Sequence, residues 1–144
     1  MSVYARFKRN QNGLRQLVEL WETTPMERRK RMIEVGMDED PNYTQMVMQY
    51  VMTFQDVLAL GEMALAELIA IVPPRMMAFS LAGADETTCE RFLKCAKPPV
   101  AAEIRDFLGV KVGLREIGSA QLKVVEKLRE LERRGLVNVK KIPL

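Results

Sequence analysis

The stretch VMTFQDVLALGEMALAEL, residues 51–68, decides the fold class of this chain. Thr53 has the sequence of a helix start, and Gly61 separates this short segment from a second one whose apolar residues recur every three or four positions. That spacing is typical of an α-helix with one buried face. The residues predicted to lie on the buried face are Leu65, Leu68, Ile69 and Val72.

The same stretch is acidic, although the chain as a whole carries a net charge of +3. Glu62 and Glu67 lie off the apolar face, so we predict that both carboxylates are exposed to solvent. No lysine or arginine occurs between Asp56 and Arg75. The middle of a basic chain therefore contains a helix whose exposed charges are all negative.

Outward from this stretch, short helical segments alternate with proline and glycine. Thr24, Pro25 and Glu27 form a helix start with a predicted capping box, and Gly36 is the predicted stop of that helix. Asp40 is predicted to cap the next helix. Further helices are predicted to begin near Pro73–Pro74, Asp85 and Pro98–Pro99, and the longest to run to Gly135.

These patterns predict an all-α chain, since no alternation typical of strands occurs outside the last few residues. Short helices are not stable alone, so we expect them to stack in an armadillo-like or solenoid-like superhelical bundle with a C-terminal helical lobe. The predicted organisation is a loose N-terminal arm, an N-terminal helical segment, a hinge-like connector and a C-terminal helical bundle, at residues 1–12, 13–50, 51–60 and 61–144.

The composition argues against an enzyme, a metal site and a bound cofactor. The chain contains no histidine, the commonest general base and metal ligand, and no glycine-rich phosphate loop. Cys89 and Cys95 lie on one predicted helix, about 9 Å apart along its axis, so we predict that they are not bridged. No apolar run reaches the roughly 18 residues of a membrane span, and the N-terminus does not resemble a secretory signal. We therefore expect a cytoplasmic protein.

Several short motifs follow one another along the chain. They are EDP at 39–41, VMTFQDV at 51–57, LAGA at 81–84, VAAEIRD at 100–106, VGLREI at 112–117, AQ at 120–121 and RRGLV at 133–137. In their order and spacing these motifs resemble the middle and C-terminal part of the flagellar motor switch protein FliG. The chain is similar to a divergent or truncated member of that family.

The resemblance implies a rotor component that works through protein contacts without a cofactor. Its implied partners are other flagellar rotor proteins, the cytoplasmic loop of the stator, and further copies of itself in a ring or oligomer. Its implied location is the cytoplasmic face of the inner membrane, in the flagellar basal body. The residues that match the family's hinge are Val51, Met52, Thr53 and Phe54, and those implied to bind a partner are Glu62, Glu67 and Arg75.

Two alternatives remain open at this point. The family's charged helix also carries basic residues, which residues 61–68 lack, so one alternative is an adaptor module that uses the same fold outside the flagellum. A helical nucleic-acid-binding domain is a further alternative, because Arg28–Arg31 is an uninterrupted basic run and the C-terminal helix is also basic.

Overall fold

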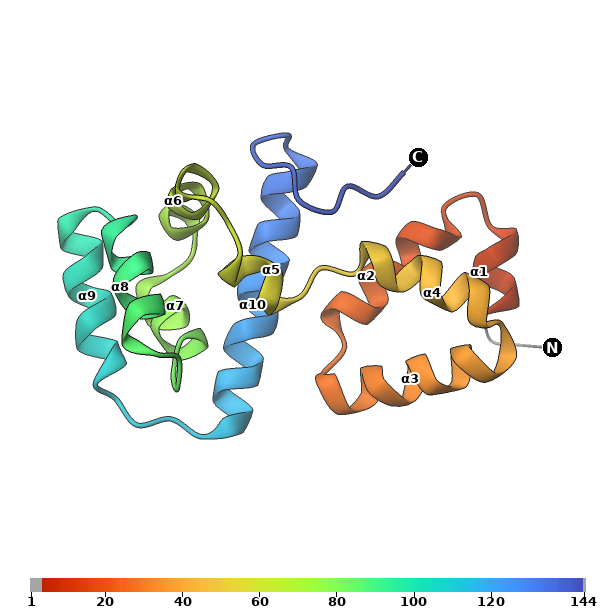
Figure 1. Ribbon diagram of the computed structural model, residues 1–144, viewed down its shortest axis with the longest axis horizontal. Helices are drawn as coiled ribbons and strands as arrows, with labels where there is room; N and C mark the ends of the chain where they lie inside the picture. The colour runs from red at the N-terminus through yellow and green to blue at the C-terminus, as the bar shows by residue number, and fades with distance from the viewer. Residues whose placement is uncertain (1–3, 144) are drawn as a thin grey trace. The chain divides into compact units, whose positions relative to one another are not determined.

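The computed structural model describes residues 4–143, which form ten α-helices and no strand (Figure 1). The first four helices are α1 (Ala5–Arg9), α2 (Gly13–Thr23), α3 (Met26–Glu39) and α4 (Pro41–Tyr50). The other six are α5 (Phe54–Leu58), α6 (Glu62–Ile71), α7 (Pro74–Ser80), α8 (Glu86–Lys94), α9 (Pro98–Leu108) and α10 (Leu114–Arg133). The all-α prediction is confirmed.

The described chain forms two compact units. The first contains the residues up to Met52 together with the tail from Val139, and the second is Thr53–Asn138. The sequence predicts that the tail belongs to the C-terminal bundle, whereas it packs with the first unit because Ile142 is buried in that unit's core. The stretch predicted to be a loose arm contains helix α1, and residues 54–58 of the predicted connector form α5.

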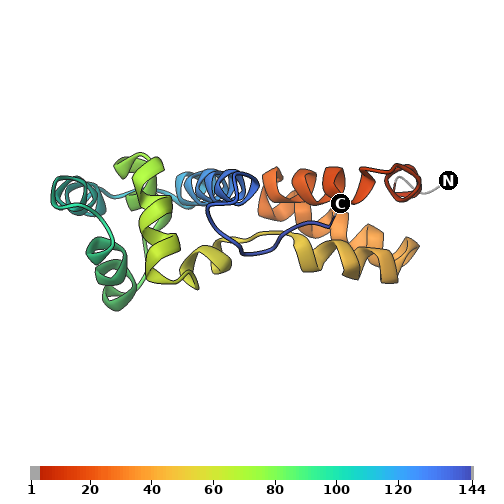
Figure 2. The same cartoon turned by 90° about the horizontal axis from the view of Figure 1, so that it is seen from above.

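The first unit is built around Trp21 of α2, which is fully buried. Helix α1 packs on α2, and α4 packs on both α2 and α3, as Figures 1 and 2 show. Tyr4 lies edge-on to Trp21, with ring centroids 6.0 Å apart, and its hydroxyl donates a hydrogen bond to the carbonyl oxygen of Met32 at 2.6 Å. The other buried apolar residues of this core are Leu17, Val18, Tyr43, Val47, Val51 and Ile142.

Helix α3 differs from its sequence prediction at both ends. The Thr24 hydroxyl donates to the carbonyl oxygen of Leu20 in the preceding helix, so it does not cap α3, and Pro25 occupies the cap position. Gly36 does not end the helix. The Asp40 N–H donates to the Gly36 carbonyl at 2.8 Å, and Gly36 is buried where α3 crosses α4. The close packing of α3 on α4 therefore explains the glycine at this position, and a turn does not.

The second unit is organised by its longest helix. Helix α10 packs against α7, α5 and α6, and α7 and α8 both pack against α9. The Gln121 side chain of α10 donates a hydrogen bond to the carbonyl oxygen of Ser80, at the end of α7, at 3.1 Å. Buried apolar side chains of this core include Leu65, Leu68, Ile69, Val72, Phe92, Ile104, Val124, Leu128 and Leu131. The apolar face predicted for residues 65–72 is confirmed.

The helix caps predicted at Asp40, Thr53 and Asp85 are present in the structure. Asp40 and Asp85 cap α4 and α8 as predicted, accepting hydrogen bonds from the backbone N–H groups of Tyr43 and Thr88. Thr53 precedes α5, and its N–H donates to the Asp56 carboxylate at 2.8 Å. None of the helices described here combines the length and the apolar content needed to cross a membrane.

Candidate functional site

The outer face of α6 carries the two acids singled out from the sequence. Glu62 is the first residue of the helix and Glu67 lies one and a half turns further on, and both side chains are exposed. The opposite face of the helix is anchored by fully buried Leu65 and Leu68. Neither carboxylate forms an ion pair with another residue of the described chain. Both are therefore available to a partner.

Met63 belongs to this acidic face and was not selected from the sequence. Its exposed fraction is 86%, which is high for a large apolar side chain. It lies one turn before Glu67 on the same side of the helix. A helical-wheel argument could have found it, because Met63 falls opposite the buried Leu65. An exposed apolar residue between charged neighbours is a common centre for a protein contact. We call Glu62, Met63 and Glu67 the acidic face.

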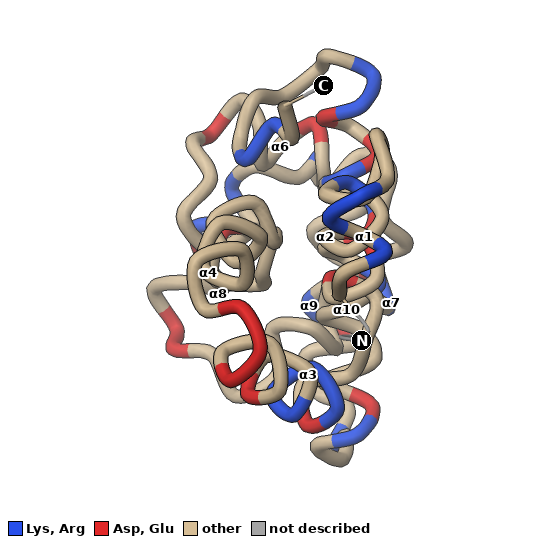
Figure 3. The backbone as a smooth tube through the Cα atoms, turned by 90° about the vertical axis from the view of Figure 1, so that its right-hand side faces the viewer, with Lys and Arg blue, Asp and Glu red and all other residues tan. Residues whose placement is uncertain are grey.

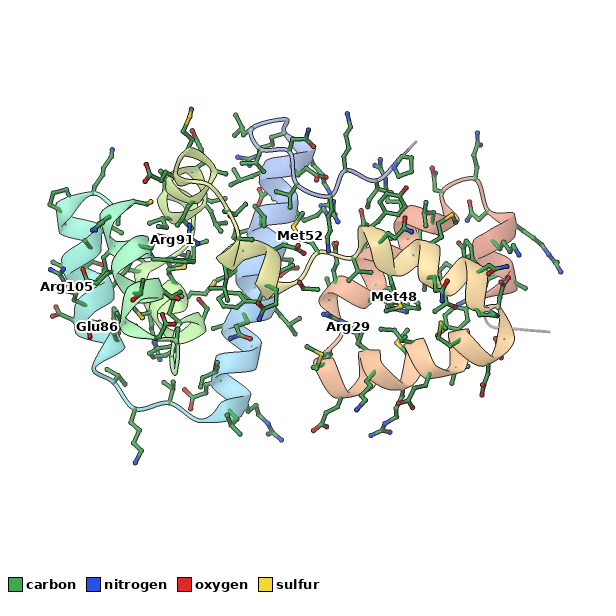
Figure 4. The ribbon with its side chains drawn as sticks, in the orientation of Figure 1. Arg29, Met48, Met52, Glu86, Arg91 and Arg105 are labelled. Carbon is green, nitrogen blue, oxygen red and sulfur yellow. The ribbon has the colours of Figure 1, made fainter. Side chains whose placement is uncertain are left out.

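The entry to α6 is held by a residue that the sequence pattern did not indicate. The Arg91 guanidinium of α8 donates hydrogen bonds to the carbonyl oxygens of Leu60, at 2.7 Å, and of Leu58 (Figure 4). These carbonyls lie at the end of α5 and in the turn that leads to α6. Arg91 therefore fixes the start of the helix that carries the acidic face. Its partners are more than thirty residues away, so no local signal identifies it.

Arg75, the third predicted partner-binding residue, lies on a different helix. It is the second residue of α7, exposed, and its guanidinium lies over the Phe79 ring at 5.3 Å from the centroid. It forms no ion pair with Glu62 or Glu67. The contact with Phe79 is local, since one turn of the same helix separates the two residues. The structure does not join Arg75 to the acidic face through any such contact.

The residues predicted to form a hinge are hydrogen-bonded on both sides of the boundary between the units. The Lys140 ammonium donates to the carbonyl oxygen of Val51 at 3.0 Å, and the Met52 N–H donates to the carboxylate of Glu22 at 2.7 Å. Both contacts lie within the first unit. Thr53 and Phe54 begin the second unit, where Thr53 precedes α5. Met52, labelled in Figure 4, is fully buried.

The basic run at residues 28–31 does not form one surface. Arg29 points inward, is 6% exposed, and donates hydrogen bonds to the carbonyl oxygens of Glu22 and Thr24. Burial lowers the pKa of this guanidinium, while the Glu22 carboxylate raises it. Lys30 is exposed, as are Arg28 and Arg31. The burial of Arg29 therefore interrupts the basic run on the surface of α3, which weakens the nucleic-acid alternative.

Acidic residues and cysteines are the candidate metal ligands of this chain, since it contains no histidine. Over residues 4–143, no three acidic, cysteine or histidine side chains converge as metal ligands do. Cys89 and Cys95 are free thiols, so the prediction that they are not bridged to each other is confirmed. Burial raises the pKa of the Cys89 thiol, and the negative charges of Asp85 and Glu90 raise it further. The thiol is therefore a weak nucleophile.

The comparison with protein-family models gives a match over most of the chain. Residues 37–139 match the model described as the FliG C-terminal domain. The chain belongs to the FliG C-terminal domain family. The matched region includes both the connector residues and the helix that carries the acidic face. No curated protein matches the chain by sequence.

Solved FliG structures share this fold. A crystal structure of FliG residues 86–343 from H. pylori matches with a TM-score of 0.64 and 19% identity, covering 90% of this chain. The structure of full-length FliG from Aquifex aeolicus matches with a TM-score of 0.55 and 26% identity, also covering 90% of this chain. This chain spans 62% of the H. pylori fragment and 41% of the Aquifex protein. The similarity shows the fold and extends to only part of each FliG protein.

Proposed function

We propose that this FliG-family chain is a non-enzymatic subunit of a flagellar rotor and switch complex, and that it acts through the acidic face of α6. The family assignment supports the rotor role. The proposed contact rests on the arrangement of α6. This helix presents Glu62, Met63 and Glu67 to solvent, while its other side is buried in the second unit. A rigid helix with an exposed, unpaired charge pattern can transmit force or switching state to a bound partner.

The chemistry of this face specifies its partner. Two carboxylates around a methionine match a surface with lysine or arginine beside a small apolar site, because charge complementarity selects the partner and apolar contact adds affinity. Other flagellar rotor proteins and the cytoplasmic loop of the stator are the proposed partners, and further copies of this chain in a ring or oligomer are proposed as its assembly. The proposed location is the cytoplasmic face of the inner membrane at the flagellar basal body. Arg75 is proposed as a separate contact on α7.

The connector is proposed to act as a hinge between the two units. Its support is the set of hydrogen bonds that fix Val51 and Met52 to the first unit and the start of α5 in the second. With both sides fixed, the proposed rotation takes place about the backbone dihedral angles between Met52 and Thr53. Hinges of this kind use a few residues at the ends of elements.

Charge reversal on the acidic face tests the proposal. In Glu62→Lys/Glu67→Lys we expect circular dichroism and thermal unfolding close to wild type, because exposed unpaired charges contribute little to folding. Swimming in soft agar and co-purification with rotor and stator proteins are expected to be lost. The matched control is Glu116→Lys/Glu103→Lys, which reverses one exposed acid in the first turn of α10 and one further along α9. A folded acidic-face variant with wild-type swimming and co-purification would refute the proposal.

The adaptor alternative rests on one observation, the absence of any basic residue between Asp56 and Arg75. It predicts that a strain lacking the chain swims normally, and that the Glu62→Lys/Glu67→Lys variant loses a partner that is not a flagellar protein. The deletion strain therefore separates the two functions before any partner is identified.

A further inference from the structure

The first unit contains a groove that the α6 contact does not use. The groove lies between α1, α2 and α3 and has a volume of about 320 Å³. Its floor is apolar: Tyr4 is buried, and Phe7 and Met32 are half-buried. Leu20 and Val35 form its walls, with exposed fractions of 41% and 47%. A concave apolar site of this size accommodates a large apolar side chain from a partner.

Three arginines surround this groove, Arg6 from α1 and Arg28 and Arg31 from α3. No acidic side chain lines it. Arg28 and Arg31 are three residues apart and therefore project from the same side of α3. Figure 3 shows the basic segments of α1 and α3 in blue. None of the three arginines forms an ion pair within the described chain, and Arg6 lies over the Phe7 ring at 5.3 Å.

We propose that this groove binds an acidic amphipathic peptide segment of a partner protein. A large apolar side chain of the peptide fills the space between Leu20 and Val35, and its carboxylates pair with Arg6, Arg28 and Arg31. Arginine suits this role because its planar guanidinium donates two parallel hydrogen bonds to a carboxylate. The site requires a partner of negative charge, whereas the acidic face of α6 requires a positive one. The two surfaces therefore recognise different partners, and the groove does not depend on the proposed rotor function.

The shape and chemistry of the groove favour a peptide over other anionic partners. Nucleic-acid affinity comes from many phosphate contacts, whereas only three guanidinium groups surround this groove and its interior is apolar. A bilayer surface is flat and is met by protruding apolar side chains, whereas the apolar surface here is recessed between helices. A peptide with protruding apolar residues and flanking carboxylates uses both parts of the site.

A synthetic peptide tests this assignment directly. The probe is a fluorescein-labelled helical peptide with phenylalanine and leucine along one side and glutamate on the flanking positions. One control peptide replaces every glutamate with lysine, and another replaces the apolar residues with serine. For the full chain, we expect fluorescence anisotropy to show at least about tenfold tighter binding of the acidic probe than of either control. Methyl spectra are expected to shift at Leu20, Met32 and Val35.

Variants locate the site and separate it from general charge attraction. Arg28→Glu/Arg31→Glu is expected to weaken binding of the acidic probe by at least about tenfold and to favour the lysine probe. Lys30→Glu/Lys123→Glu makes the same change in net charge at two exposed positions outside the groove lining and is expected to alter affinity less than about twofold. Val35→Asp places a charge in the wall and is expected to abolish binding, with circular dichroism reporting the fold of each variant.

Several results would overturn the assignment. Equal affinity for the acidic and lysine probes, equal weakening by both double variants, or methyl shifts away from the groove would each do so. Vesicles of phosphatidylglycerol or duplex DNA that bind more tightly than the probe, and lose binding in Arg28→Glu/Arg31→Glu, would assign the groove to those ligands instead. Sedimentation that shows a dimer of the wild type but not of Arg28→Glu/Arg31→Glu would assign it to a second copy of the chain.

Discussion

The carboxylate of Glu22 accepts a hydrogen bond from the backbone N–H of Met52, with 2.7 Å between oxygen and nitrogen. Both residues are buried, and thirty positions separate them in the sequence. This contact attaches the end of α4 and the start of the connector to α2. It also places a negative charge near the buried Arg29 guanidinium, which raises the pKa of that group against the effect of burial. One side chain therefore satisfies a backbone donor and compensates a buried cation.

Replacing Glu22 tests how firmly the connector is attached to the first unit. Glu22→Ala leaves the buried Met52 N–H without its acceptor, so we expect a loss of about 1.5–3 kcal/mol in the free energy of unfolding. Hydrogen exchange at the Met52 amide is expected to accelerate. Glu22→Gln keeps an acceptor oxygen and is expected to lose less stability. Urea denaturation and exchange measured by NMR check both variants, and unchanged protection of Met52 in Glu22→Ala would contradict the attachment.

Substitution by alanine is expected to change the free energy of unfolding in opposite directions at Gly36 and Gly118. A Cβ atom at Gly36 would lie 2.5 Å from the Oγ1 atom of Thr44 and 3.2 Å from its Cγ2 atom, so both branches of that side chain crowd the position. Gly36→Ala is therefore expected to lower the free energy of unfolding by about 1–3 kcal/mol. Gly118→Ala, inside α10 with no neighbouring atom within 4 Å, is expected to raise it by about 0.4–1 kcal/mol.

Thr44→Ala provides the check on the mechanism at Gly36. If the cost of Gly36→Ala is a collision with Thr44, the two changes combined should cost less than the sum of the single changes, as a double-mutant cycle measured by chemical denaturation will show. Additive effects would place the cause of the destabilisation elsewhere in α3.

Arg91 and Arg105 are expected to contribute very differently to the stability of the fold. Arg91→Met removes two hydrogen bonds to backbone carbonyls at the entry to α6, and we expect a loss of about 2 kcal/mol together with faster hydrogen exchange in the first turn of α6. Arg105 pairs with Glu90 at 3.8 Å, and both side chains are about half-exposed. Arg105→Met is therefore expected to change stability by less than about 0.5 kcal/mol. Similar losses in the two variants, measured by urea denaturation, would remove the special role of Arg91.

The Asp85 cap predicts a loss of stability in acid. Hydrogen bonds from Thr88 hold the pKa of the Asp85 carboxyl below its ordinary value of 3.8. Because the folded state has the lower pKa, the ionised cap stabilises the fold above the ordinary value, and this contribution is lost as the pH falls through the folded value. Asp85→Asn is therefore expected to have a flatter stability curve below about pH 4 than wild type.

The control for this acid effect is Asp106→Asn. Asp106 is exposed, and its carboxylate forms no hydrogen bond within residues 4–143. Thermal unfolding followed between about pH 2 and about pH 6 checks all three proteins. If Asp85→Asn and wild type lose stability in parallel as the pH falls, the cap does not contribute to the loss of stability in acid.

The sequence alone predicts the local features of this fold. These are the all-α class, the boundaries near Pro73–Pro74 and Pro98–Pro99, the Asp40 and Asp85 caps and the buried face of α6. They depend on interactions between residues that are close in the chain, such as helical spacing and a cap with its own first turn. The resemblance to FliG was predictable for a similar reason, since it rests on the order of short local motifs, and the family match confirms it.

What only the tertiary structure decided involves residues far apart in the chain. Glycine is typical of a helix end, so the sequence predicts a stop at Gly36. Only the crossing of α3 with α4 shows why a side chain is excluded there. Arg29 and Arg31 are equivalent in sequence, yet one is buried against the end of α2 and the other borders a groove. Likewise, Arg91 reaches the entry to α6, and Glu22 reaches Met52, across about thirty residues. Sequence patterns report local preference, whereas these roles depend on which helix faces meet, because hydrogen bonds and steric contacts act over only a few ångströms in space.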